Sequence, residues 1–201
     1  MQPSQDYYDL IDSYKKLHEQ EGKFKGISLI PLVPTLMKIV KDNDCKTLLD
    51  YGCGKAIPYD KERCREVDLR NPIQELCSLE SFDLYDPAYE KYATLPDKKY
   101  DVVVCTDVLE HIAEQDIDYV LTDVLSHSKK IVFLNICCKP ALKHFKEGKF
   151  KGKNVHISLF EPDWWGRKIG NIWNNFNHTK VYTVCNAKQG NHVTCIKKEK
   201  E

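Results

Sequence analysis

The chain has 201 residues, 42% of them hydrophobic and 10% aromatic, which is enough for one domain with a hydrophobic core and short for two. Its 30 Lys and Arg balance 30 Asp and Glu, so net charge gives no support to a sequence-independent nucleic-acid binder, although residues 139–153 form a local basic patch. No apolar run approaches the roughly 20 residues that span a bilayer, and the first residues lack a basic and then apolar leader pattern. We therefore expect a soluble, cytoplasmic protein without a membrane partner.

The N-terminal residues predict two helices. Residues 4–20 carry apolar side chains at helical spacing, with Ser4 as N-cap and Gly22 as the stop. A second helix is predicted from about Pro34 to Val40. We interpret residues 1–44 as a helical extension or lid over a core of residues 45–201, within a single domain of residues 1–201.

Apolar strand-like runs then alternate with helical patterns. Strands are predicted at 46–51, 81–85, 100–105 and 130–135, helices at 117–125 and 163–176, and a terminal hairpin at 180–185 and 192–198. This alternation predicts an α/β fold with a mostly parallel sheet covered by helices on both faces. The hairpin adds an antiparallel strand.

A glycine bend follows the first predicted strand. Gly52 and Gly54 let the backbone turn tightly and let a ligand approach it closely. A dinucleotide fingerprint needs a third small residue where Ile57 stands, and a P-loop needs a Lys-Ser/Thr pair that is missing. S-adenosylmethionine has no phosphates; it needs a carboxylate near its cationic end and an acid for its ribose hydroxyls. Asp50 and Asp86 stand at the ends of the first two strands.

Three segments resemble the class I S-adenosylmethionine-dependent methyltransferases. Residues 50–54, Asp-Tyr-Gly-Cys-Gly, resemble motif I; Asp86 resembles the ribose-binding acid; and residues 101–112 resemble the fourth strand and following loop of the small-molecule branch. The resemblance covers residues 45–136, and the hairpin fits the last two strands. It implies a Rossmann-like three-layer sandwich with a seven-strand sheet in the order 3-2-1-4-5-7-6. It also implies transfer of a methyl group to a small-molecule acceptor, leaving S-adenosylhomocysteine.

Cofactor-binding residues follow from the same resemblance. They are Asp50, Tyr51, Gly52, Cys53, Gly54, Asp86, Pro87, Leu95, Thr106 and Asp107. Two departures stand out. Residues 58–80 are polar and poorly periodic, so loop replaces or extends the first helix of the core. Residues 87–99 leave little room for a helix and a strand, so the third, edge strand is short or absent and residues 94–96 lie near the adenine.

Catalytic and acceptor-binding candidates each have a structural alternative. His111 suits a general base or local packing, Asp107 suits the methionine end, the acceptor or a helix cap, and His156 suits catalysis in an acceptor pocket. Aromatic residues are predicted to line that pocket, with burial in the core as the alternative: Tyr7, Tyr8, Trp164 and Trp165. The acceptor, the methylated atom and the oligomeric state are not predicted.

Two other functions remain open. Residues 86–89, Asp-Pro-Ala-Tyr, resemble the D-P-P-Y motif of adenine amino-methyltransferases, but they precede the fourth-strand candidate and lack the second proline. Nucleic acid is thus the less favoured partner. A non-catalytic protein that binds S-adenosylmethionine is the other alternative.

The nine cysteines include no C-x-x-C pair, which predicts reduced, mostly buried thiols, Cys195 among them. No metal is therefore expected; a metal site or a redox pair is the alternative.

Overall fold

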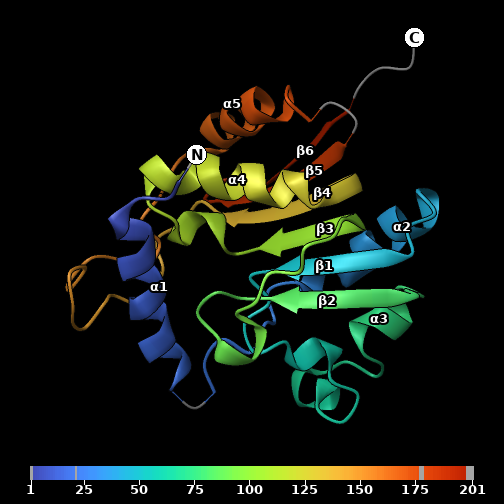
Figure 1. The fold of residues 1–201 in the computed structure, drawn as a ribbon, viewed down its shortest axis with the longest axis horizontal. Helices are drawn as coiled ribbons and strands as arrows, with labels where there is room; N and C mark the ends of the chain where they lie inside the picture. The colour runs from blue at the N-terminus through green and yellow to red at the C-terminus, as the bar shows by residue number, and fades with distance from the viewer. Residues whose placement is uncertain (1, 21, 177–178, 198–201) are drawn as a thin grey trace.

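A computed structural model describes residues 2–20, 22–176 and 179–197, and its centre is one six-stranded sheet in the order β2-β1-β3-β4-β5-β6 (Figure 1). Neighbouring strands are parallel except for the antiparallel pair β5–β6. The strands are β1 (Thr47–Tyr51), β2 (Ser81–Tyr85), β3 (Tyr100–Thr106), β4 (Ser128–Cys137), β5 (Lys180–Ala187) and β6 (Gly190–Ile196). The predicted α/β class, mostly parallel sheet and terminal hairpin are confirmed, except that residue 198 lies outside the described residues.

Helices cover both faces of this sheet and make three layers. The described α-helices are α1 (Gln5–His18), α2 (Val33–Asp42), α3 (Ile73–Leu76), α4 (Ile117–Ser126) and α5 (Pro162–Trp173), of which α2 to α5 cover the two faces. Apolar residues of α4 and α5 pack on one face of the sheet, and those of α2 and α3 pack on the other. The predicted Rossmann-like three-layer sandwich with N-terminal helices is confirmed.

The order of the last strands differs from the prediction, whereas the expectation that the third, edge strand is short or absent holds. Residues 87–99 contain only a 3-10 turn at Glu90–Tyr92, so the described part of the chain has no third edge strand and six strands in place of seven. β5, not the last strand, pairs with β4. Its side chains are largely buried on both faces, whereas those of β6 are exposed, and an inner parallel strand must be apolar on both sides. Cys195 on β6 is consequently exposed rather than buried.

The segment between β1 and β2 consists of short turns and a single turn of α-helix. It contains 3-10 turns at Ile57–Tyr59 and Cys64–Val67, followed by the four-residue α3. The expectation that loop replaces a full first core helix therefore holds. Its buried side chains still fill the sheet face beneath it, as Ile73 does.

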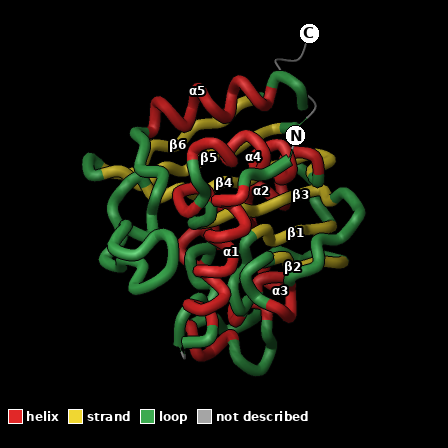
Figure 2. Tube along the Cα trace, turned by 60° about the vertical axis from the view of Figure 1, so that its left-hand side comes forward, coloured by secondary structure: helices red, strands yellow, loops and turns green. Residues whose placement is uncertain are grey.

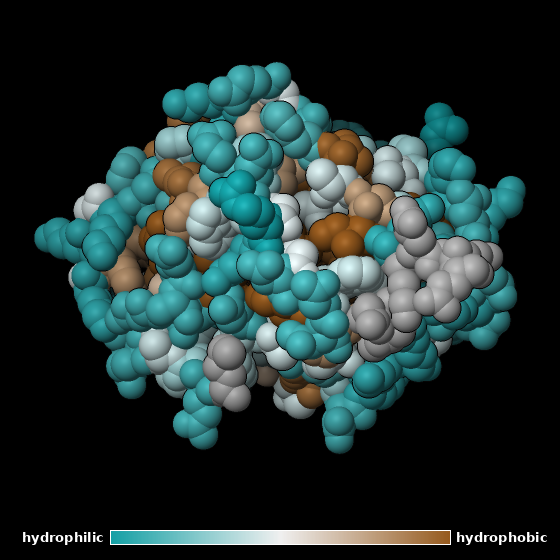
Figure 3. Space-filling model, turned by 90° about the horizontal axis from the view of Figure 1, so that it is seen from above, coloured by the Kyte–Doolittle hydropathy of each residue, from teal (hydrophilic) through white to brown (hydrophobic). Residues whose placement is uncertain are grey.

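The helix α1 lies across the carboxyl ends of the parallel strands, to which the arrowheads in Figure 1 point, and Figure 2 shows it in front of the sheet. Ser4, predicted as its N-cap, makes no capping bond; its hydroxyl donates to Asp116 Oδ2 at 2.7 Å and ties the start of α1 to the turn before α4. The face seen from above is mostly hydrophilic, with hydrophobic side chains in separate small patches (Figure 3). No helix in the described ranges has both the length and the apolar character needed to cross a membrane.

Candidate functional site

The glycine bend after β1 is closely packed on both sides. Gly52 has φ +86° and Gly54 has φ +59°, a region that disfavours residues with a Cβ. A Cβ on Gly52 would collide with Val108 Cγ2, and one on Gly54 would lie 2.6 Å from the Phe24 carbonyl oxygen. Both glycines are therefore required by conformation and by contact.

Asp86 follows β2 and lies against this bend. Its Oδ2 accepts the Gly54 N–H at 2.9 Å and its Oδ1 accepts the Ala88 N–H at 2.9 Å. His18 Nε2 of α1 lies 3.9 Å from Oδ2. Burial raises the pKa of Asp86, opposed by His18 and the two backbone donors. The glycine bend and the second acid thus lie side by side, as the order of parallel strands predicted.

Asp50 is enclosed within β1. The side chain is buried, and its Oδ1 has no hydrogen-bond partner among the described residues. Burial raises the pKa of Asp50 to about 7, while the nearby Tyr59 hydroxyl opposes that rise. The carboxyl is therefore protonated more readily than an exposed aspartate, and Oδ1 is available to accept a hydrogen bond.

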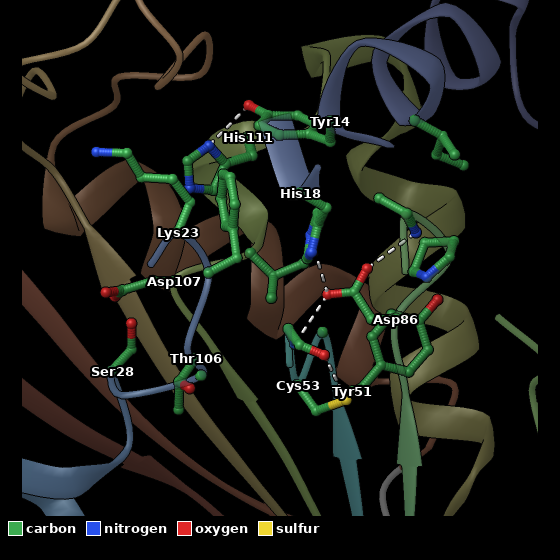
Figure 4. A pocket seen from close by; sticks show the side chains of 18 of the residues that line it. Tyr14, His18, Lys23, Ser28, Tyr51, Cys53, Asp86, Thr106, Asp107 and His111 are labelled. Atoms are coloured by element: carbon green, nitrogen blue, oxygen red, sulfur yellow. Dashed lines mark hydrogen bonds and ion pairs between the residues drawn. The ribbon is translucent and has the colours of Figure 1, made fainter. Parts of the chain in front are cut away.

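A cavity of about 380 Å³ opens between α1, the glycine bend and the loop after β3 (Figure 4). Its size falls within the roughly 300–1,000 Å³ of small-ligand sites. The cavity brings together most of the predicted cofactor residues: Asp50, Tyr51, Gly52, Cys53, Gly54, Asp86, Pro87, Thr106 and Asp107. Tyr7 and residues 24–28 also line it, on the side of the N-terminal extension.

The loop after β3 holds a third acid at the cavity. Asp107 has φ +53°, and its Oδ1 accepts the Asn135 amide at 2.6 Å. Burial raises the pKa of Asp107, and the Ser28 hydroxyl lowers it. Since Ser28 belongs to the segment after α1, this contact links the N-terminal extension to the core (Figure 4).

His111 forms part of the cavity wall opposite the glycine bend. Its Nδ1 lies 2.8 Å from the Tyr14 hydroxyl and 3.0 Å from the Val155 carbonyl oxygen. Burial lowers the pKa of His111 to about 4, helped by the neighbouring His156 ring. The imidazole is therefore neutral at physiological pH. When Nδ1–H donates to Val155, Nε2 keeps a lone pair that can accept a proton.

Five predicted site residues lie outside this cavity. Tyr8 is 51% exposed, and Leu95 packs beside the core on the α4–α5 face. Trp165 is fully buried in that core, and Trp164 stacks on Phe160 with ring centroids 3.8 Å apart. His156 borders a separate, shallower pocket, but its ring lies 4.8 Å from that of His111.

Sequence reasoning missed several residues that line the cavity, among them His18, Lys23, Val108 and Lys143. His18 follows Tyr14 by four residues and so lies on the same face of α1, a periodicity that could have identified it. Lys143 belongs to the basic segment noted above. No local pattern marks Val108 or Lys23.

Comparisons with known proteins agree with this geometry. The family model of the methyltransferase domain matches residues 28–169, more than half of the chain. The chain is also similar to the ubiquinone biosynthesis O-methyltransferase of Hydrogenovibrio crunogenus, with 26% identity over 108 residues. That alignment covers 48% of this chain and 45% of the relative, so the chain spans less than half of the relative's length. The chain therefore belongs to the class I S-adenosylmethionine-dependent methyltransferase family.

Proposed function

We propose that this chain binds S-adenosylmethionine in the cavity behind α1 and transfers its methyl group to a small-molecule acceptor. One observation carries the proposal: Asp50, Asp86 and the Gly52–Gly54 bend meet at the edge of one cavity. Acids and a glycine bend at the carboxyl ends of adjacent parallel strands suit a nucleoside bound at that edge.

The residues fit such a cofactor. Asp50 Oδ1 is buried without a partner and suits the cationic end. Each oxygen of Asp86 accepts one backbone N–H, and a carboxylate oxygen can accept a second bond, so ribose hydroxyls are accommodated. When bound, S-adenosylmethionine supplies an activated methyl group on its sulfonium.

The chain itself contributes alignment, exclusion of water and acceptance of a proton. Apolar residues of α1, such as Leu10 and Ile11, line the cavity and shield it from bulk water. Neutral His111 is the candidate proton acceptor because a lone pair on Nε2 is available. With its lowered pKa, it can take a proton only from an acceptor group that becomes acidic as it gains the methyl group. Because α1 covers the strand ends, the cavity favours a small acceptor over a duplex or a protein segment.

Calorimetry tests cofactor binding. Wild-type protein titrated with S-adenosylmethionine and S-adenosylhomocysteine is expected to bind both. Asp86→Ala should bind roughly tenfold or more weakly, because it loses a charge-assisted hydrogen bond worth about 1.5–3 kcal/mol. Asp97→Ala, a change at an exposed carboxylate, is the matched control and should bind normally. Absence of binding by the wild type, or unchanged binding by Asp86→Ala, contradicts the site.

A labelling experiment tests the acceptor class. Protein and methyl-labelled S-adenosylmethionine are incubated with the low-molecular-weight, nucleic-acid and protein fractions of a cell extract. Label is expected in the low-molecular-weight fraction, and S-adenosylhomocysteine should suppress it. Label in nucleic acid instead would support the adenine methyltransferase alternative, and tight cofactor binding with no label in any fraction would support a non-catalytic role.

A further inference from the structure

Three side chains that can bind a metal meet beside the cavity, on segments far apart in the sequence. Glu110 lies in the turn after β3, Cys137 ends β4, and His156 lies in the loop before α5. One possible ligand atom from each lies within 4.8 Å of the other two. A sequence without C-x-x-C or closely spaced His and Cys pairs does not reveal such a cluster.

Glu110 offers an oxygen that lacks a partner. The side chain is fully buried, and its Oε1 accepts the Cys137 N–H at 2.9 Å. Its Oε2 is buried with no hydrogen-bond partner in the described part of the chain. An unpaired carboxylate oxygen in the interior is costly, and a bound cation removes that cost.

His156 is oriented as metal-binding histidines are. Its Nδ1 lies 2.6 Å from the Lys139 carbonyl oxygen, and its backbone N–H donates to Asn154 Oδ1 at 2.9 Å. With Nδ1–H on the carbonyl, Nε2 keeps its lone pair, and a backbone carbonyl commonly holds a metal-ligating imidazole in this way. Cys137 and His156 are both partly exposed, so an ion can reach them from solvent.

We propose that Glu110, Cys137 and His156 bind one Zn²⁺ ion. A set of one sulfur, one nitrogen and one oxygen donor suits Zn²⁺, whereas Mg²⁺ and Ca²⁺ prefer oxygen alone. Three protein ligands leave a fourth position for water or another small ligand, the arrangement of exchangeable rather than purely structural zinc sites. The proposal does not depend on methyl transfer, because binding of the ion requires no cofactor.

The ion would stand next to the methyl-transfer cavity. The His156 ring packs edge-on against His111, which lines that cavity. Glu110 directly precedes His111 in the same turn. A ligand in the fourth position would therefore lie near His111, the candidate proton acceptor of the proposed active site.

Metal analysis of tag-free protein tests the site. The protein is stripped with a chelator, dialysed against Zn²⁺ and analysed by mass spectrometry for metal content. About one Zn²⁺ per chain is expected. Glu110→Gln, Cys137→Ser and His156→Asn should each weaken Zn²⁺ binding by tenfold or more in competition with a chromophoric chelator. Co²⁺ loading should give a thiolate-to-cobalt absorption band that Cys137→Ser abolishes.

Two control variants sharpen the result. Cys138→Ser removes the adjacent thiol, and His192→Asn removes an exposed imidazole on β6; both should bind Zn²⁺ as the wild type does. Circular dichroism and thermal unfolding establish that each variant is folded. The proposal is overturned by a wild type that retains no Zn²⁺, by unchanged affinity in the three ligand variants, or by loss in Cys138→Ser but not in Cys137→Ser.

Discussion

The Gly54 N–H donates to the carboxylate of Asp86 at 2.9 Å, so the bend after β1 and the acid after β2 form one unit. The neighbouring Gly52 N–H donates to the Tyr85 carbonyl at 2.7 Å and strengthens the same link. These bonds fix the floor of the cavity before any ligand arrives. Preorganisation of this kind reduces the ordering that binding would otherwise require.

Gly54→Ala tests that floor. The residue has φ +59°, and an added Cβ would lie 2.6 Å from the Phe24 carbonyl oxygen, so the backbone of the bend or of Phe24 would have to shift. We expect a loss of about 1–3 kcal/mol in unfolding free energy, together with weaker S-adenosylmethionine binding. Urea unfolding and calorimetry measure the two effects.

Gly170→Ala is the matched control for that change. Gly170 lies within α5, and an added Cβ there meets nothing within 4 Å. Alanine favours the helix by about 0.5–1 kcal/mol over glycine, so this variant should be more stable than the wild type. Equal stabilities of the Gly54 and Gly170 variants would show that the bend tolerates a side chain.

Asp50→Asn tests the buried carboxyl through its pH dependence. Because the pKa of about 7 in the folded chain lies above the roughly 3.9 of an unfolded aspartate, the folded state holds an extra proton between these values. The contribution of Asp50 to stability therefore falls as pH rises from about 4 to about 7. Raising the pH from 4 to 8 should therefore change the difference in unfolding free energy between Asp50→Asn and the wild type by about 1–4 kcal/mol, in favour of the Asn variant.

Urea unfolding of both proteins across this pH range measures the difference. Asp97→Asn, at an exposed carboxylate, should follow the wild type at every pH. A constant difference in unfolding free energy between Asp50→Asn and the wild type would mean that Asp50 is ionised throughout. In that case a donor must satisfy Oδ1.

The contact between Gly54 and Asp86 could be predicted because it follows from strand topology. The carboxyl ends of parallel neighbours meet at one edge, so residues directly after β1 and β2 must lie close together. The position of β6 could also have been predicted. Its polar residues suit an edge, and β5 is the more apolar member of the hairpin.

Other parts of the site depend on long-range packing. An aromatic residue at the start of a helix indicates an apolar helix face, but the sequence does not reveal which elements pack on that face. Position 165 was therefore equally consistent with a pocket wall and with the core that Trp165 occupies. The cluster of Glu110, Cys137 and His156 joins three separate segments. Its geometry arises only when the loop before α5 folds back over the strand ends.

Tyr14→Phe tests the link between α1 and the loop before α5. The Tyr14 hydroxyl donates to the Val155 carbonyl at 2.8 Å and lies 2.8 Å from His111 Nδ1. Loss of this hydroxyl should lower the unfolding free energy by about 0.5–1.5 kcal/mol. Tyr8→Phe, at a half-exposed ring, should change stability by less than about 0.5 kcal/mol. Equal effects of the two changes would mean that the Tyr14 bonds add no net stability.

Trp165→Ala distinguishes a core role from an acceptor-binding role. The side chain is fully buried against the α4–α5 face of the sheet and does not line the cavity. Its removal should cost about 3–5 kcal/mol of unfolding free energy, as large-to-small changes in a core do. Trp165→Phe should recover part of that loss, and calorimetry on this folded variant should show normal S-adenosylmethionine affinity. A stable Trp165→Ala protein with impaired turnover alone would instead place Trp165 at the acceptor, because only a residue outside the core can be truncated without opening a void.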